Sequence, residues 1–162
     1  APAQAATAPV QWADSVCGAL RSWVDTVHNA SAAAAKSKPG SAANVRTKLT
    51  KLLALTQHET SSLLADLKRA GEPDVKGGKQ IAATIREGFR QVLSAVADAK
   101  KTLAKAKTKD PTGFLNAARS VQDALESSLE GVQAAFSAAR TADVAPLLAA
   151  FAADKDCRAV AS

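Results

Sequence analysis

Apolar residues recur at steps of three and four along four long stretches of this 162-residue chain. This spacing places them on one side of an α-helix, and it is typical of amphipathic helices that share a core. A β-strand needs an alternation with a period of two, and residues that favour strands are scarce, since the chain has two Ile and no Tyr. Alanine, the strongest helix former, occurs 39 times. We therefore expect an all-α protein.

Turn-forming residues between these stretches mark where the helices begin and end. Proline is favoured in the first turn of a helix, Ser and Asp are favoured as N-caps, and glycine follows the last turn. Such residues occur at Pro9, Pro39, Gly40, Ser41, Gly71, Asp110, Pro111 and Asp143. The expected long helices span residues 9–35, 42–70, 79–107 and 111–140, and a short fifth helix spans residues 144–153.

Short connections between four long helices favour an up-down-up-down antiparallel bundle. We expect residues 9–162 to form this single domain. Residues 1–8 are small, uncharged and low in complexity, and we expect them to be disordered. The mid-helix glycines Gly88 and Gly131 are interpreted as positions of close helix approach.

The only two cysteines lie near opposite ends of the chain. Cys17 falls within the apolar arc of the first helix, on the flank away from Trp12 and Trp23, and Cys157 follows the fifth helix. The chain has no C-x-x-C-H motif and no Cys or His spacing of a metal site, so we expect neither a cofactor nor a metal. A structural disulfide is the favoured interpretation, with free or functional thiols as the alternative.

A Cys17–Cys157 bond would tether the fifth helix near the start of the first one. In the chain-entropy model, closing a loop of this length stabilises the fold by about 5 kcal/mol. Disulfides persist in oxidising compartments. The small, uncharged start from Ala1 is typical of an exported protein after signal removal, although an experimenter may also choose such a start. We therefore expect a secreted, extracytoplasmic protein, and no run of 18 apolar residues predicts a membrane span.

A cluster of lysines is the sharpest surface feature of the sequence. It comprises Lys100, Lys101, Lys105, Lys107 and Lys109. Lys101, Lys105 and Lys109 are expected to form a stripe with a spacing of four residues at the end of the third helix, and Lys100 and Lys107 widen it. Cations are favoured at a helix C-terminus by the helix dipole, which is the structural explanation. The functional hypothesis is an anionic surface such as phospholipid headgroups or a cell-wall polyanion, whereas interleaved aromatic residues that would indicate nucleic acid are missing.

Enzymatic chemistry finds little support in the sequence. The two histidines, His28 and His58, stand apart from any Glu-x-x-His motif of a di-metal bundle, and the carboxylates are dispersed. Neither a G-x-S-x-G motif nor a phosphate-binding glycine loop is present. We therefore expect a protein that is not an enzyme.

The segment Trp12-Ala-Asp-Ser-Val-Cys17-Gly-Ala-Leu-Arg-Ser-Trp23, with the late Phe151 and Cys157, resembles small exported helical proteins and lipoproteins of high-GC Gram-positive bacteria. The resemblance implies export and carries no catalytic residues. The leading hypothesis is a secreted, non-enzymatic helical bundle that acts as a binding module at the cell envelope. Its partner would be an unknown protein or an anionic envelope component, with contact at the membrane surface as one form. The alternative is a carrier of lipid or of a small apolar ligand in the bundle core.

Overall fold

The computed structural model describes residues 5–36, 40–141 and 144–161. Within these residues the chain is almost entirely helical, as predicted, and the only β-type pairing is an isolated bridge between Thr7 and Pro73. The helices are α1 (Pro9–Lys36), α2 (Ala42–Ala70), α3 (Gly78–Lys105), α4 (Pro111–Thr141), α5 (Ala145–Ala153) and α6 (Lys155–Ala161). None of them has the length and apolar character that crossing a membrane requires.

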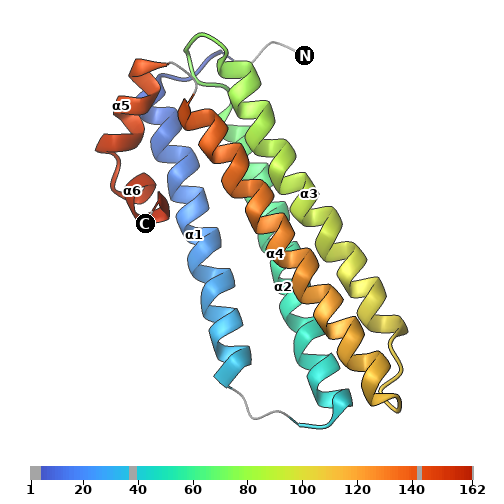
Figure 1. Ribbon diagram of the computed structural model, residues 1–162. Coiled ribbons are helices and arrows are strands. Elements are labelled where there is room, and N and C mark those ends of the chain that lie inside the picture. Colours follow the sequence, from blue (N-terminus) through green and yellow to red (C-terminus); the bar gives the residue numbers. More distant parts are fainter. Residues whose placement is uncertain (1–4, 37–39, 142–143, 162) are drawn as a thin grey trace.

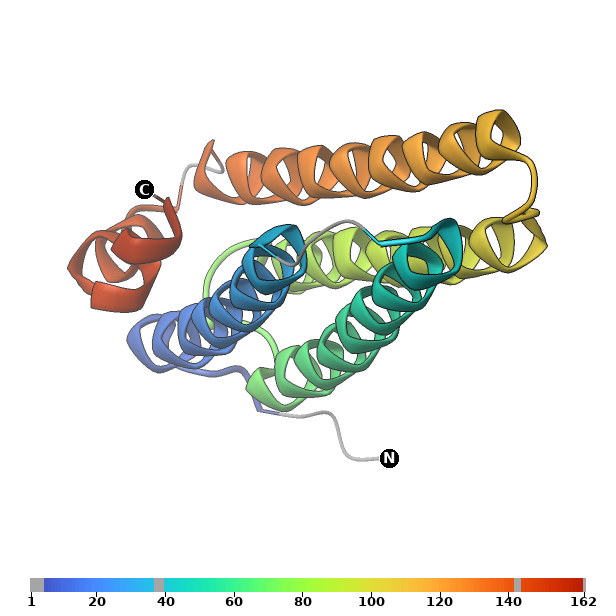
Figure 2. The same cartoon turned by 90° about the horizontal axis from the view of Figure 1, so that it is seen from below.

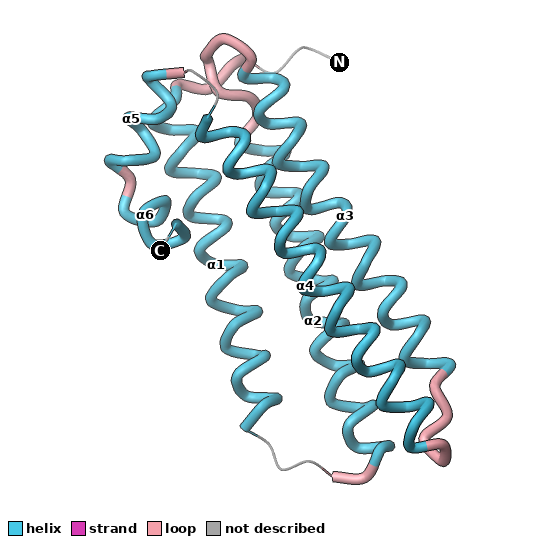
Figure 3. The backbone as a smooth tube through the Cα atoms, in the orientation of Figure 1, coloured by secondary structure: helices cyan, strands magenta, loops and turns pink. Residues whose placement is uncertain are grey.

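The four long helices lie side by side, and α5 and α6 sit beside one end of α1 (Figure 1). The end of α1 and the start of α2 lie at the lower end of the molecule, as does the α3–α4 connection, whereas the α2–α3 connection lies at the upper end (Figure 3). Viewed from below, α3 lies between α4 and the pair formed by α1 and α2 (Figure 2). Accordingly, α4 packs mainly along α3.

Helix α3 supplies the centre of the core because its apolar residues fall on one face at helical spacing. Phe89, Val96 and Leu103 are fully buried along this face. The core then continues into the facing sides of α1, α2 and α4, where Trp12, Val16, Leu20, Trp23, Leu53, Leu63, Leu67, Phe114, Val121 and Val132 are buried. Hydrophobic burial of this kind is the main force that holds amphipathic helices together.

Both tryptophans combine apolar burial with a hydrogen bond from the indole nitrogen. Trp12 Nε1 donates to the carbonyl oxygen of Gly71 across 3.0 Å, and this bond fixes the start of α1 to the end of α2. The Trp23 ring meets Phe89 edge-on, with ring centroids 5.4 Å apart. Buried aromatic residues with a polar group usually find such partners, since an unsatisfied N–H would destabilise the core.

Helix α4 has a narrower buried face than its sequence pattern predicts. Phe114, Val121 and Val132 are buried, but Leu129, which belongs to the same predicted stripe, is 45% exposed. Because α4 packs mainly on one neighbour, only the residues directed at α3 are covered. Gly88 faces α4, and a Cβ atom there would lie 3.5 Å from the Cβ atom of Ala135, an ordinary contact distance, whereas Gly131 is exposed and has no atom of α3 closer than 4.0 Å to an added Cβ.

Three local expectations are corrected. Helix α3 ends at Lys105 rather than at residue 107, because Ala106 adopts an extended conformation. The residues after Asp154, for which no helix is predicted beyond the fifth one, form helix α6. Thr7, within the segment expected to be disordered, exchanges backbone hydrogen bonds with Glu72 and Asp74 (2.8 and 2.7 Å). Residues 1–4 and the predicted cap Asp143 lie outside the described residues.

Candidate functional site

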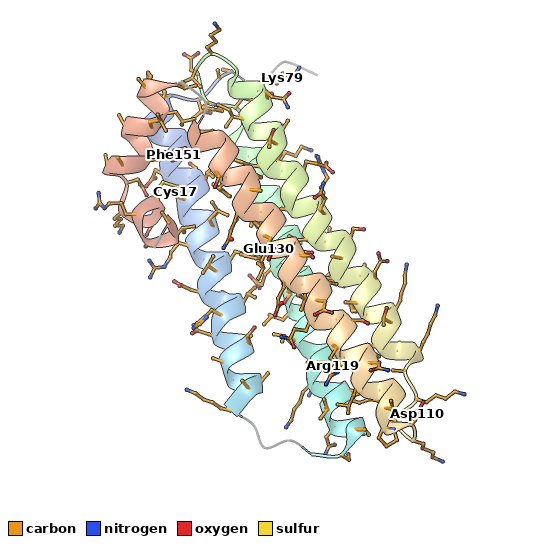
Figure 4. The ribbon with its side chains drawn as sticks, viewed as in Figure 1. Cys17, Lys79, Asp110, Arg119, Glu130 and Phe151 are labelled. Carbon is orange, nitrogen blue, oxygen red and sulfur yellow. A yellow bond between two sulfur atoms is a disulfide. The ribbon has the colours of Figure 1, made fainter. Side chains whose placement is uncertain are left out.

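Cys17 and Cys157 form a disulfide, as the sequence predicts, with their Cα atoms 4.9 Å apart. Cys17 lies in the first half of α1 and Cys157 in α6, so the bond joins residues separated by 140 positions. Both cysteines are buried in a small cluster of their own, together with Ala13 and Ala150. Figure 4 places Cys17 and Phe151 close to each other at this end of the molecule.

The helices α5 and α6 form a short unit that covers the start of α1. Phe151 of α5 packs at 6.1 Å, between ring centroids, against Trp12. Asp154 separates the two helices, and its Oδ1 atom accepts hydrogen bonds from the backbone N–H groups of Asp156 and Cys157, both at 2.9 Å. Asp154 is therefore the N-cap of α6, and it orients the turn that carries Cys157 toward α1.

The two sulfur atoms and an Asp154 oxygen lie within 4.8 Å of one another, a spacing that could hold a metal ion. However, a metal binds cysteine as a thiolate, and both sulfurs here belong to the disulfide. The Asp154 oxygen already accepts two backbone hydrogen bonds. In this oxidised form Cys17, Cys157 and Asp154 have a structural role, because they hold α6 against α1. We call them the disulfide clamp.

A charged pair lies beside the clamp on α1. Arg21 Nε donates to Asp25 Oδ2 across 2.8 Å. This hydrogen bond, together with the Asp25 charge and a smaller contribution from Asp156 of α6, raises the pKa of the Arg21 guanidinium above its usual value. Both side chains of the pair are substantially exposed, so the pair contributes little to stability.

The predicted lysine cluster is distributed over two environments. Lys100 is half-buried, and its Nζ atom donates to Gln57 Oε1 of α2 across 2.8 Å, so this lysine has a structural role. Lys101 is exposed and lies 3.9 Å from an Asp98 oxygen. Lys105 occupies the last turn of α3. The predicted stripe with a spacing of four residues is therefore interrupted after Lys105.

Lys107 and Lys109 lie in the connection between α3 and α4 and are exposed. The connection ends at Asp110, which caps α4 by accepting a hydrogen bond from the backbone N–H of Gly113 (3.1 Å). A residue that precedes proline disfavours helical geometry, which explains why α3 cannot run on into α4. Figure 4 shows Asp110 and Arg119 at the lower end of the molecule, remote from Cys17 and Phe151.

A second group of cations, in the first part of α2, was not predicted from the sequence to form a surface. Arg46, Lys48 and Lys51 belong to the first part of α2, whose N-terminus lies at that end (Figure 1). Lys48 and Lys51 border a shallow surface depression of about 320 Å³ between α1 and α2. The other residues that line it are Ala30, Ala33, Ala34, Leu52 and Leu55. A signal for this surface existed in the sequence, since no Asp or Glu occurs between Asp25 and Glu59.

A further depression of about 430 Å³ lies near the other end of the α1–α2 interface, lined by Ser15, Gly18, Ala19, Asp66, Arg69 and Ala70. Both depressions are open to solvent. His28 and His58 are exposed on different helices.

Comparison of the chain with protein-family models, with curated proteins and with solved structures finds no significant match.

Proposed function

We propose that this chain is an extracytoplasmic, non-enzymatic binding module of up-down-up-down topology that acts at the cell envelope of a bacterium of the high-GC Gram-positive type. The observation that carries the proposal is the position of the exposed lysines. Lys101, Lys105, Lys107 and Lys109 lie at the end of the bundle that faces away from the disulfide clamp. A concentrated positive charge at one end favours an anionic partner.

The disulfide supports an oxidising compartment as the site of action. It also supports a division of tasks along the bundle, because the clamp stabilises one end while the lysines at the other end are available to a partner. In this proposal the long helices form a rigid spacer between the two ends.

A co-sedimentation experiment tests the proposal. The protein is mixed with vesicles that contain acidic phospholipid, or with purified cell-wall polyanion, at low and at high salt. We expect binding that weakens as salt rises, since added ions screen exposed charges. Absence of binding to both, or binding that does not respond to salt, would contradict the proposal.

A matched pair of variants assigns the binding to the cluster. The triple variant Lys105→Gln, Lys107→Gln and Lys109→Gln removes three exposed cations and leaves the Lys100–Gln57 bond intact. The control variant Lys76→Gln, Lys79→Gln and Lys155→Gln removes three exposed cations from other parts of the surface. Binding should be lost in the first variant and retained in the second.

The second candidate is a carrier of lipid or of another apolar ligand. The depression lined by Leu52 and Leu55 favours it, and its volume lies at the lower limit of typical ligand pockets. It lies at the surface, whereas the central positions Phe89, Val96 and Leu103 are filled by their own packed side chains. Native mass spectrometry of protein purified from its own host distinguishes the two candidate functions. A carrier should retain a bound lipid, whereas the binding module should be recovered without one.

A further inference from the structure

We infer that the lower end of the bundle docks end-on to a bilayer of anionic phospholipid, and that the facing ends of α1 and α2, called here the α1–α2 hairpin, contribute to this contact together with the lysine cluster. The inference rests on the proposed function and names its partner and its full contact surface. We call this surface the basic end and define it by two stretches of described residues, 26–36 with 40–58 and 99–109.

The charge of the whole chain is concentrated in these two stretches. Together they contain nine of the 21 Lys and Arg residues and none of the 15 Asp and Glu residues. The rest of the chain has twelve basic and fifteen acidic residues, so it is negative by three charges while the chain as a whole is at +6. The net positive charge of the protein therefore belongs entirely to the basic end.

The fold places the two stretches in the lower half of the molecule. They comprise the last three turns of α1, the first part of α2, the last two turns of α3 and most of the α3–α4 connection. The end of α1, the start of α2 and the α3–α4 connection all lie at the lower end in Figure 1, and Figure 2 views the molecule from this end. The bond from Lys100 to Gln57 joins the two stretches directly. Lys79, by contrast, lies at the upper end (Figure 4).

Few carboxylates oppose these cations. Asp98 precedes the second stretch and lies 3.9 Å from Lys101, and Asp110 follows it and caps α4. Among the cations, Lys36, Lys51, Lys105, Lys107 and Lys109 are exposed. The Nε atom of Arg46 is buried and has no hydrogen-bond partner among the described residues. The basic end therefore offers more positive charge than the protein itself neutralises.

The apolar lining of the adjacent depression favours a bilayer over a fully hydrophilic polyanion. Leu52, Leu55 and three alanines form most of its wall, and Lys48 and Lys51 stand beside them. An apolar surface bordered by lysines suits the boundary between lipid headgroups and acyl chains, where the lysine stems lie on apolar material and the ammonium groups reach phosphate. A soluble polyanion would gain nothing from the leucines.

The test uses vesicles of phosphatidylglycerol and phosphatidylcholine, and the double variant Lys36→Gln and Lys51→Gln. Both lysines are exposed and belong to the hairpin, not to the lysine cluster. A lysine near an anionic bilayer strengthens binding about fivefold, so the double variant should bind roughly 25-fold more weakly. The matched control Lys76→Gln and Lys79→Gln removes the same charge from exposed positions outside the basic end and should bind like the unaltered protein.

The outcomes separate this inference from the proposed function. If the hairpin variant binds as tightly as its control while the triple variant of the lysine cluster loses binding, the end-on contact is overturned and the proposed function stands. Polyglutamate serves as a soluble polyanion without an apolar phase. Equal affinity for polyglutamate and for vesicles would overturn the bilayer as partner. Weak binding to polyglutamate and tight binding to vesicles would support it.

Discussion

The indole Nε1 of Trp23 donates a hydrogen bond to Thr60 Oγ1 across 3.1 Å inside the core, and so joins α1 to α2. The Thr60 hydroxyl in turn donates to the backbone carbonyl of Thr56 at 2.6 Å. Thr60 is fully buried, so water cannot replace either bond. The Thr60 hydroxyl therefore accepts a hydrogen bond from α1 and donates one to a carbonyl oxygen of its own helix, α2.

Replacing this hydroxyl should destabilise the protein without changing its shape. The variant Thr60→Val keeps the side-chain volume but leaves the Trp23 N–H buried without a partner. We expect the free energy of unfolding to fall by about 1–3 kcal/mol. Thr47→Val is the matched control, since Thr47 is an exposed residue of the same helix whose hydroxyl bonds only within α2. Urea unfolding followed by circular dichroism measures both, and equal stabilities would show that the buried bond contributes nothing.

Reduction of the disulfide should lower the melting temperature while the four long helices stay largely formed. The bond reduces the conformational entropy of the unfolded chain by closing a loop of 140 residues. This effect contributes up to about 5 kcal/mol to the free energy of unfolding. The long helices keep their shared core without it. Thermal melts and the helical signal at 25 °C, compared between oxidised and reduced protein, check this prediction. Identical melting temperatures in the two states would refute the clamp.

Two glycine-to-alanine substitutions should act in opposite directions. A Cβ atom at Gly78, the first residue of α3, would overlap the backbone carbonyl oxygen of Pro73, and the tight turn has no room to shift. We expect Gly78→Ala to lower the free energy of unfolding by about 1–3 kcal/mol.

Gly131 is exposed within α4, and the nearest atom to an added Cβ lies 4.0 Å away. Gly131→Ala should raise stability by about 1 kcal/mol through helix propensity. Chemical denaturation of both variants tests the signs.

Loss of the Asp154 cap should loosen α6 and expose the disulfide. Asp154→Ala removes the acceptor of two backbone hydrogen bonds in a helix of only seven residues. A lost N-cap costs about 1 kcal/mol, so the disulfide should be reduced several-fold faster by dithiothreitol. Asp154→Asn retains a capping oxygen and should be reduced at nearly the original rate. Equal reduction rates in all three proteins would show that the cap does not control access to the bond.

The sequence predicted the long helices well because each one combines an apolar stripe with a clear boundary. Residues 42–70 match α2 at both ends, since Ser41 caps the start and Gly71 permits the stop. The pairing of Cys17 with Cys157 was also predictable, because the chain has no other cysteine. These features depend on local chemistry or on counting, which a single sequence contains.

Features that depend on the tertiary arrangement were missed. The exposure of Leu129 follows from the position of α4 on one side of α3, and no periodicity encodes that position. Thr7 is held by backbone hydrogen bonds and by its hydroxyl, which donates to the carbonyl oxygen of Ala70, and a single threonine in a small, uncharged segment gives no pattern that predicts these partners. Helix α6 was predictable in principle, because Asp154 precedes it as a cap. The basic end required the fold to place residues 26–36 and 40–58 in the same half of the molecule as residues 99–109.

The disulfide also determines how the chain would carry a mechanical load. Tension that enters before Cys17 and leaves after Cys157 passes directly through the sulfur–sulfur bond. Helices α2, α3 and α4 lie entirely within the closed loop, so a pulling force reaches them only through non-covalent contacts, such as the hydrogen bond from Trp12 to Gly71, and not along the backbone. Helix α4 packs mainly on α3, and tension along the backbone would not pull it away from α3. Only the first turns of α1 and the end of α6 would extend under force, and the lower end of the bundle would keep its form.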